Sequence, residues 1–138
     1  MSMQEAVCYR PRSIPLPTRI TTYAVVLAAR LLATRSPTRI RWVLGRLRPG
    51  ARPATALEAR AARSAVVAVS LACAGRQGCL PRSLATVLLC RLRGQWPTWC
   101  LGARRIPPFA AHAWVEAEGI AVEEDFPRDY FRTFFTVP

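Results

Sequence analysis

Two residues of this 138-residue chain, a cysteine and a histidine, have types and positions that could perform nucleophilic chemistry. Cys79 follows Gly78 at the expected start of a helix, where unpaired backbone N–H groups and the helix dipole lower the pKa of a thiol. His112 is the only histidine, so it is the only side chain whose ordinary pKa suits proton transfer near neutral pH. We therefore expect Cys79 and His112 to act as nucleophile and base.

An acidic residue after His112 should orient its imidazole, and the length of a hairpin loop affects which one is in reach. If residues 117–119 form a three-residue loop, His112 comes to lie opposite Glu124. A two-residue loop at 118–119 would place Asp125 there instead. The sequence leaves both loops open, and we take Glu124 as the third site residue with Asp125 as the alternative. The other nearby acids, Glu123 and Asp129, are expected to be solvated.

The five cysteines do not indicate a disulfide framework, because their number is odd and their spacing is irregular. A reducing compartment would keep them as thiols. Cysteine is most often a small buried hydrophobic residue, and we expect that structural role for the four besides Cys79. No paired CxxC spacing is present, so we expect neither a metal site nor a cofactor. The four are Cys8, Cys73, Cys90 and Cys100.

Helices are expected to fill the chain before the sheet. The Pro-rich residues 1–19 are expected to be irregular, and a helix follows over 20–34. Ser36-Pro37 is a second start signal, since Ser can cap a helix and Pro suits its first turn, and it predicts a helix over 38–48.

The next helix has a capping-box start. In the segment from Thr55 to Glu58, the hydroxyl and the carboxylate can satisfy backbone N–H groups at the helix start. The Ala- and Val-rich run that follows predicts a helix to Ala74, with Gly75 as its C-cap.

The helix that begins at Cys79 tolerates Pro81 in its first turn and ends at Gly94. Apolar residues at helical spacing predict its buried stripe. They are Leu80, Leu84, Val87, Leu88 and Leu92.

Beyond residue 94 the hydrophobic period changes to two, which is typical of strands. Strands are expected over 95–102 and 110–118, and residues 120–124 make the return of a hairpin. Helices followed by a small antiparallel sheet indicate an α+β fold.

The strand that carries His112 has two different faces. His112 shares one face with Trp114 and Glu116, while the small alternating residues of 113–117 lie on the other. Phe109 precedes this strand in a Pro-rich loop and is our first choice for a substrate contact. Aromatic residues in a small sheet usually fill its interior, so we expect core packing for the three tryptophans of the predicted strands. They are Trp96, Trp99 and Trp114.

The net charge of +12 comes entirely from arginine, so part of it can reflect codon bias. Residues 1–111 hold 18 of the 20 arginines, whereas residues 112–138 hold six of the eight acids. Such a surface could attract an acidic partner or peptide. An alternative is a non-enzymatic module that binds nucleic acid or a partner, but the aromatic–basic interleaving typical of single-strand binding is absent. Its candidate residues include Arg39, Arg41, Arg46 and Arg48.

A chain of this length with 51% hydrophobic residues can bury one compact core, but not two. We expect a helical N-terminal extension over 1–54 and a catalytic core over 55–138. The longest uncharged apolar stretch, 64–75, is shorter than the roughly 20 residues of a membrane-spanning helix. Residues 1–12 lack the apolar segment of a secretory signal. The expected location is the cytoplasm.

Several of these strings together resemble one family. CLPRSL at Cys79, a following helix rich in Leu and Arg, PFAAHAWVEAEG around His112 and an acid twelve residues later resemble the leader peptidases of lasso-peptide biosynthesis. These are transglutaminase-like proteins related to the C-terminal domain of the microcin-processing B protein. The resemblance runs from about Thr55 to the end of the chain.

The resemblance implies a transglutaminase-like or papain-like cysteine protease fold and a Cys-His-acid triad. Cys79 and His112 are carried over directly, whereas many members have Asp where this chain has Glu124. The implied activity is cleavage of a leader from a ribosomally made peptide precursor through a thioester acyl-enzyme. An acyltransferase on the same triad is the alternative. Gln77 is a candidate oxyanion donor, although a plain loop role is expected for it.

The resemblance also implies partners. They are the leader region of the precursor peptide, a separate leader-binding protein of winged-helix type, and an ATP-dependent lasso cyclase. A separate leader-binding protein is expected because residues 1–54 are too short for the winged-helix domain of fused relatives. No membrane or nucleic-acid partner is expected.

Overall fold

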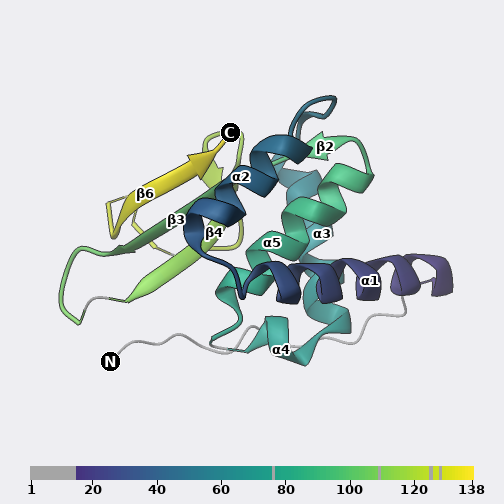
Figure 1. Cartoon of the computed structure of the whole chain (residues 1–138), viewed down its shortest axis with the longest axis horizontal. Helices are drawn as coiled ribbons and strands as arrows, with labels where there is room; N and C mark the ends of the chain where they lie inside the picture. The colour runs from purple at the N-terminus through teal and green to yellow at the C-terminus, as the bar shows by residue number, and fades with distance from the viewer. Residues whose placement is uncertain (1–14, 76, 109, 125, 128) are drawn as a thin grey trace.

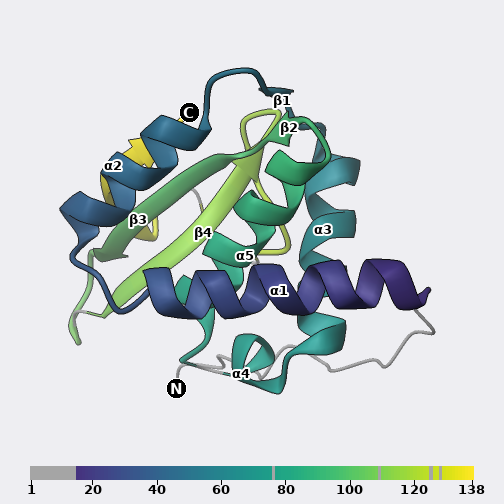
Figure 2. The ribbon, with the colours of Figure 1, turned by 45° about the vertical axis from the view of Figure 1, so that its right-hand side comes forward.

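The computed structural model describes residues 15–138 apart from 76, 109, 125 and 128. Helices from the first two thirds of the chain pack against a sheet made by the last third (Figures 1 and 2). The larger sheet has four strands, all antiparallel. This is the α+β order that the sequence patterns predicted.

Prolines begin the first two helices. Helix α1 (Leu16–Leu32) starts four residues earlier than predicted, so part of the segment expected to be irregular is helical. Pro15 is its N-cap and Pro17 lies in the first turn, where the missing N–H is not needed. Helix α2 (Pro37–Leu47) begins as predicted, and the Ser36 hydroxyl accepts a hydrogen bond from the backbone of its first turn at 3.4 Å.

Helix α1 has a buried face and an apolar exposed face. Val25, Val26 and Ala29 lie in the core. In the part of the chain that the structure describes, no helix is both long and apolar enough to span a membrane. The large apolar side chains on the exposed face of α1 are each more than half exposed, and they are Leu16, Ile20, Tyr23, Leu27 and Leu31.

Several arginines that could serve a nucleic-acid-binding module contact other parts of the chain instead. The Arg41 guanidinium lies 5.4 Å from the centre of the Phe135 ring, and that of Arg46 lies 5.1 Å from the Trp42 ring. Arg48 donates hydrogen bonds to two backbone carbonyls, at 2.9 and 2.6 Å. These contacts give Arg41, Arg46 and Arg48 a role within the fold.

The capping box at Thr55 is present, and helix α3 (Ala56–Val69) follows it. The prediction of one helix to Ala74 is wrong, because the chain breaks at Ser70, which has extended backbone angles. The Ser70 hydroxyl accepts a hydrogen bond from the Cys73 N–H at 3.2 Å, so it caps the short helix α4 (Leu71–Ala74).

Helix α5 (Cys79–Leu92) lies in the middle of the molecule, between α1 and α3 on one side and the sheet on the other (Figure 2). It starts and ends as predicted. Leu84 and Val87 are fully buried, but the buried surface extends around the helix to residues such as Leu89. The prediction for Leu92 is wrong, since it is 65% exposed in the last turn.

A short parallel pair, β1 (Arg52–Pro53) and β2 (Gln95–Trp96), lies beside the main sheet. Pro97 separates β2 from β3, so the strand predicted over 95–102 is divided in two. The main sheet has the order β5-β4-β3-β6. Its strands are β3 (Thr98–Arg104), β4 (Ala111–Ala117), β5 (Ile120–Ala121) and β6 (Phe131–Val137).

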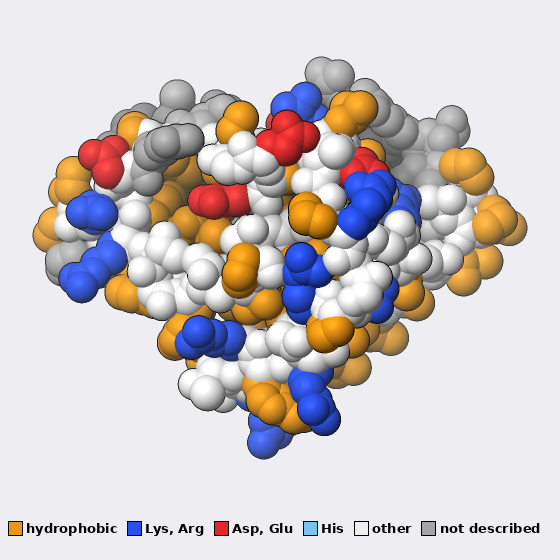
Figure 3. All heavy atoms as spheres, turned by 90° about the horizontal axis from the view of Figure 1, so that it is seen from above, with side chains coloured by type: hydrophobic (Ala, Val, Ile, Leu, Met, Phe, Trp, Pro, Cys, Tyr) orange, Lys and Arg blue, Asp and Glu red, His pale blue; other side chains and the backbone are white. Residues whose placement is uncertain are grey.

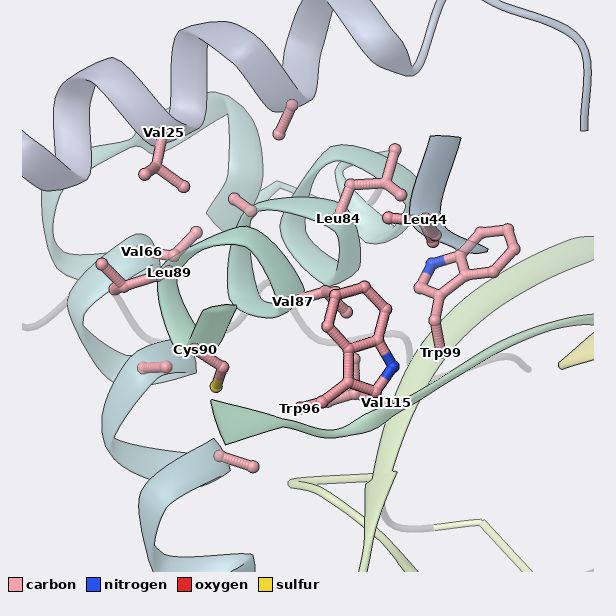
Figure 4. Packing of buried hydrophobic residues seen from close by; sticks show 14 of the residues in the cluster. Val25, Leu44, Val66, Leu84, Val87, Leu89, Cys90, Trp96, Trp99 and Val115 are labelled. Carbon is pink, nitrogen blue, oxygen red and sulfur yellow. The ribbon is translucent and has the colours of Figure 1, made fainter. Parts of the chain in front are cut away.

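The core surrounds α5, with residues of the other helices on one side and of the sheet on the other (Figure 4). Trp99 is fully buried and donates its indole N–H to the Ser83 hydroxyl of α5 at 3.1 Å. Trp96 is buried and donates to the Val137 carbonyl of β6 at 3.2 Å. Core packing of these two tryptophans is therefore confirmed. Ala113, Val115 and Ala117 of β4 face the same core.

Gly102 allows β6 to approach β3 closely at the level of the histidine. It lies opposite His112 in the β3–β4 ladder, and the pairing of β3 with β6 shifts between residues 101 and 102. A Cβ atom on Gly102 would lie only 2.3 Å from the Arg132 carbonyl oxygen of β6. Position 102 therefore needs glycine for lack of space.

Candidate active site

Cys79 is the first residue of α5, and its sulfur lies against the strand that carries His112. The thiol hydrogen-bonds with the His112 side chain and with the Ala113 backbone N–H. Backbone groups of alternate strand residues point to the same side, so the Ala113 N–H points to the same edge of β4 as the Val115 carbonyl, which accepts the Val122 N–H at 2.9 Å. Strand β5 pairs only with the last two residues of β4, so it does not cover the Ala113 N–H. This N–H therefore points to the side where the sulfur lies.

Burial and hydrogen bonding act in opposite directions on both groups. Burial raises the pKa of Cys79, but hydrogen bonds to His112 and the Ala113 N–H, with the positive charges of His112 and Arg82, lower it further than burial raises it. Burial lowers the pKa of His112, but Cys79 and Glu124 outweigh it and raise that pKa to about 9. The contact between the two side chains therefore favours the charged form of each.

Glu124 is the acid that the structure brings to the imidazole. Its Oε1 lies 3.3 Å from His112 Nε2, and both side chains are nearly buried. The hairpin has the two-residue loop 118–119, which the loop-length argument linked to Asp125. That argument assumed that strand pairing continues past residue 121, but the chain leaves the ladder after β5. Glu123 has a left-handed backbone, at φ 54°, and this turns the chain toward the histidine. Asp125 lies outside the described residues.

Arginines of α3 and α5 surround the segment that carries this acid. Arg60 Nε lies 2.7 Å from Glu123 Oε1, so Glu123 is an ion-pair partner rather than only a solvated acid. Arg63 is buried; burial and the nearby Arg82 lower its pKa, while Glu124 and Glu123 act in the opposite direction. Arg82 is buried too and donates to a carbonyl of α4 at 2.9 Å. Nothing in the sequence separates these arginines from the others.

Aromatic rings hold the imidazole from several directions. The His112 ring stacks on Phe131, with centroids 4.8 Å apart, and on Trp114 at 5.8 Å. The Phe126 ring meets it edge-on at 5.6 Å. Phe131 belongs to β6, a strand that the sequence analysis did not predict. The ring is thereby fixed in orientation, which a base needs in order to face one nucleophile.

A family model described as the transglutaminase-like superfamily matches residues 23–136, which is most of the chain. The chain belongs to the transglutaminase-like superfamily. This superfamily includes cysteine peptidases and transglutaminases, and the match confirms the predicted fold class. Comparisons with curated proteins and with solved structures found no match. The matched range begins within α1, and the predicted boundary at residue 54 stays a prediction.

The other described cysteines of this transglutaminase-like domain are buried. Burial raises the pKa of Cys90 and of Cys100 to about 12, so their thiols stay protonated. Cys73 lies in α4, and Cys8 falls outside the described residues. Among the residues that the structure describes, no group of three or more His, Cys, Asp or Glu side chains could hold a metal ion.

The first turn of α5 offers backbone donors for an oxyanion. Pro81 has no N–H and the Arg82 N–H donates to the Gly78 carbonyl at 2.8 Å, so among the described residues of this turn the N–H groups of Cys79 and Leu80 are the candidates. The other candidates from the sequence contribute less. Gln77 is exposed next to the helix start, and Phe109 lies outside the described residues.

A pocket of about 440 Å³ lies on the opposite side of the imidazole from the core. Its walls combine aromatic rings with acidic side chains, and Glu116 accepts the Trp114 indole N–H at 3.2 Å. His112, Trp114 and Glu116 thus share one face of β4, as the strand period predicted. The lining includes Glu124, Phe126 and Phe131.

At pH 7, iodoacetamide is expected to modify Cys79 before any other described cysteine. The pKa of Cys79 is lowered, so its thiolate persists below the pH at which an ordinary thiol is protonated, whereas Cys90 and Cys100 stay protonated. Peptide mapping by mass spectrometry between pH 5 and 9 gives the rate at each cysteine. In a His112→Ala variant the Cys79 rate at pH 7 should fall. A Cys79 rate that follows an ordinary thiol titration would contradict the lowered pKa.

Proposed function

We propose that this protein is a cysteine peptidase that removes the leader from the precursor of a lasso peptide. Cys79 is the nucleophile, His112 is the general acid and base, and Glu124 orients the imidazole. The observation that carries the proposal is the contact of Cys79 and Glu124 with the same buried ring, Glu124 at 3.3 Å from Nε2. Because Nε2 faces the carboxylate, Nδ1 is the ring nitrogen that remains for the thiol.

Acylation follows from this arrangement. The Cys79 thiolate attacks the carbonyl carbon at the junction between leader and core peptide. The N–H groups of Cys79 and Leu80 stabilise the oxyanion, and the helix dipole adds to their effect. The His112 imidazolium gives its proton to the leaving nitrogen as the C–N bond breaks. The leader is then held as a thioester, and the core peptide leaves with a free amine.

Deacylation returns the site to its starting state. Neutral His112 takes a proton from water, whose oxygen attacks the thioester carbonyl. The C–S bond breaks, the leader leaves as a carboxylic acid that loses its proton to solvent, and the thiolate and imidazolium are restored. Glu124 keeps the ring in position throughout and stabilises the imidazolium whenever it forms.

The choice of substrate is supported by the resemblance of the strings around Cys79 and His112 to lasso leader peptidases. We propose the leader of the precursor as the segment bound, and a separate winged-helix protein as its carrier. An ATP-dependent cyclase then uses the amine that cleavage frees. With these partners, we propose a cytoplasmic location for the reaction.

Hydrolysis is expected when the purified protein is mixed with a lasso precursor and its leader-binding protein. The masses of the two products should sum to that of the precursor plus one water. In water enriched in ¹⁸O, one labelled oxygen should enter the new carboxylate of the leader. Mass spectrometry of the products measures both.

The same measurement separates the alternative, an acyltransferase on the same three residues. Transfer to an amine would join the leader to that amine without taking up a labelled oxygen. An intact precursor after long incubation with the leader-binding protein would contradict the peptidase proposal.

A further inference from the structure

The pocket beside His112 has the composition of a cation site. Trp114, Phe126 and Phe131 present ring surfaces, and Glu116 and Glu124 present carboxylates. Aromatic faces attract ammonium and guanidinium groups, more strongly where water is partly excluded. Its volume of about 440 Å³ is within the range of ligand-binding pockets and leaves room for a long side chain.

Glu116 is held in place without being neutralised by an arginine of the described chain. The Trp114 indole N–H donates to its Oε1 at 3.2 Å, which fixes the half-buried carboxylate on the pocket wall. Among the described residues, the ion pairs that involve glutamate are those of Glu58, Glu123 and Glu124, and none includes Glu116. The carboxylate can therefore accept hydrogen bonds from a guest.

Of the two carboxylates on this wall, Glu116 is the one left for a cation. Arg63, Arg82 and Glu124 line one small cavity, so the positive charges of the two arginines offset the negative charge of Glu124. On the face drawn in Figure 3, arginine side chains are spread widely whereas the few acidic ones lie toward its upper half. The acidic side chains on this face lie apart from one another, some of them beside arginines, so the expected preference for a cation rests on Glu116 and the pocket wall.

We propose that this pocket binds an arginine or lysine side chain of the substrate peptide. Glu116 pairs with the charged head, and Trp114 and Phe131 pack on the apolar stem and on the face of the head group. His112 forms part of this wall and Cys79 does not, so a side chain bound here lies beside the base. The substrate part of this inference rests on the proposed peptidase function, but binding itself does not.

Binding of Nα-acetyl-arginine amide tests the pocket without turnover, if the protein carries Cys79→Ala. The matched ligand is Nα-acetyl-citrulline amide, which has nearly the same shape and no charge. Isothermal titration calorimetry at low salt is expected to give at least about tenfold tighter binding for the arginine compound. Glu116→Gln added to this protein should remove most of that difference, since the amide keeps the acceptor for Trp114 but loses the charge.

Asp129→Asn is the matched control, because Asp129 is an exposed acid that does not line the pocket. It should leave the discrimination unchanged. Equal affinity for arginine and citrulline, or discrimination that survives Glu116→Gln, would overturn the proposal. If the protein binds arginine but cleaves no precursor, the pocket is supported and the peptidase function is refuted. If it cleaves precursors with no preference for a basic residue, the pocket is refuted as a substrate site.

Discussion

Cys79→Ala is expected to lower the rate of leader cleavage by about 10⁴-fold or more. The substitution removes the atom that forms the thioester, and loss of a nucleophile leaves only binding and oxyanion stabilisation. Cys79 is only half-buried at the helix start, so the fold should tolerate alanine. Single-turnover cleavage followed by mass spectrometry measures the rate, and thermal unfolding checks the fold.

Cys90→Ala is the matched cysteine variant. Cys90 lies in the same helix but is fully buried, and its pKa is raised to about 12, so it has no part in the chemistry. This variant should lose about 1 kcal/mol or more of stability from the small cavity and keep its cleavage rate at a temperature where it is folded. A folded Cys79→Ala protein that still cleaves would remove Cys79 from the mechanism.

His112→Ala is expected to lower cleavage by about 10³-fold or more. The thiol loses both its proton acceptor and the charge that lowers its pKa, so burial then raises that pKa. The variant leaves a space beside the contacting rings of Trp114 and Phe131, into which free imidazole can fit. Added imidazole should restore part of the rate, with a pH dependence set by the pKa of the added base.

A purely structural histidine would behave differently. Imidazole would then raise the unfolding temperature of His112→Ala without restoring cleavage, and that outcome would contradict the role of His112 as base. Glu124→Gln leaves the ring in place and changes only its partner, so it is expected to cost less rate than His112→Ala.

The position of the thiol could be predicted because it depends on local signals. Gly78, Pro81 and Gly94 mark the start, first turn and end of one helix, and each acts within a few residues. The strand period around His112 was equally local, and it placed Trp114 and Glu116 on the face where the structure has them. Family membership, by contrast, was inferred from the paired strings rather than from these periods.

Other features depend on contacts between distant segments, which periodicity does not encode. The acid at the imidazole depends on a left-handed residue, Glu123, after a short strand and on Arg60 and Arg63 of α3. Strand β6 has an exposed middle and no alternation that marks it, and it is fixed by pairing with β3. The break at Ser70 was hidden because one hydroxyl can start a new turn inside an Ala-rich run.

Because Gly102 has no side chain, β6 can lie close to β3, and the orientation of the imidazole depends on this glycine although it takes no part in the reaction. A methyl group there would push β6 away from β3 by its contact with the Arg132 carbonyl. Phe131 begins that strand and stacks on His112 at 4.8 Å, so its displacement would leave one side of the base unsupported. Small substitutions at position 102 thus offer a way to vary how tightly the base is held while every reacting atom stays the same.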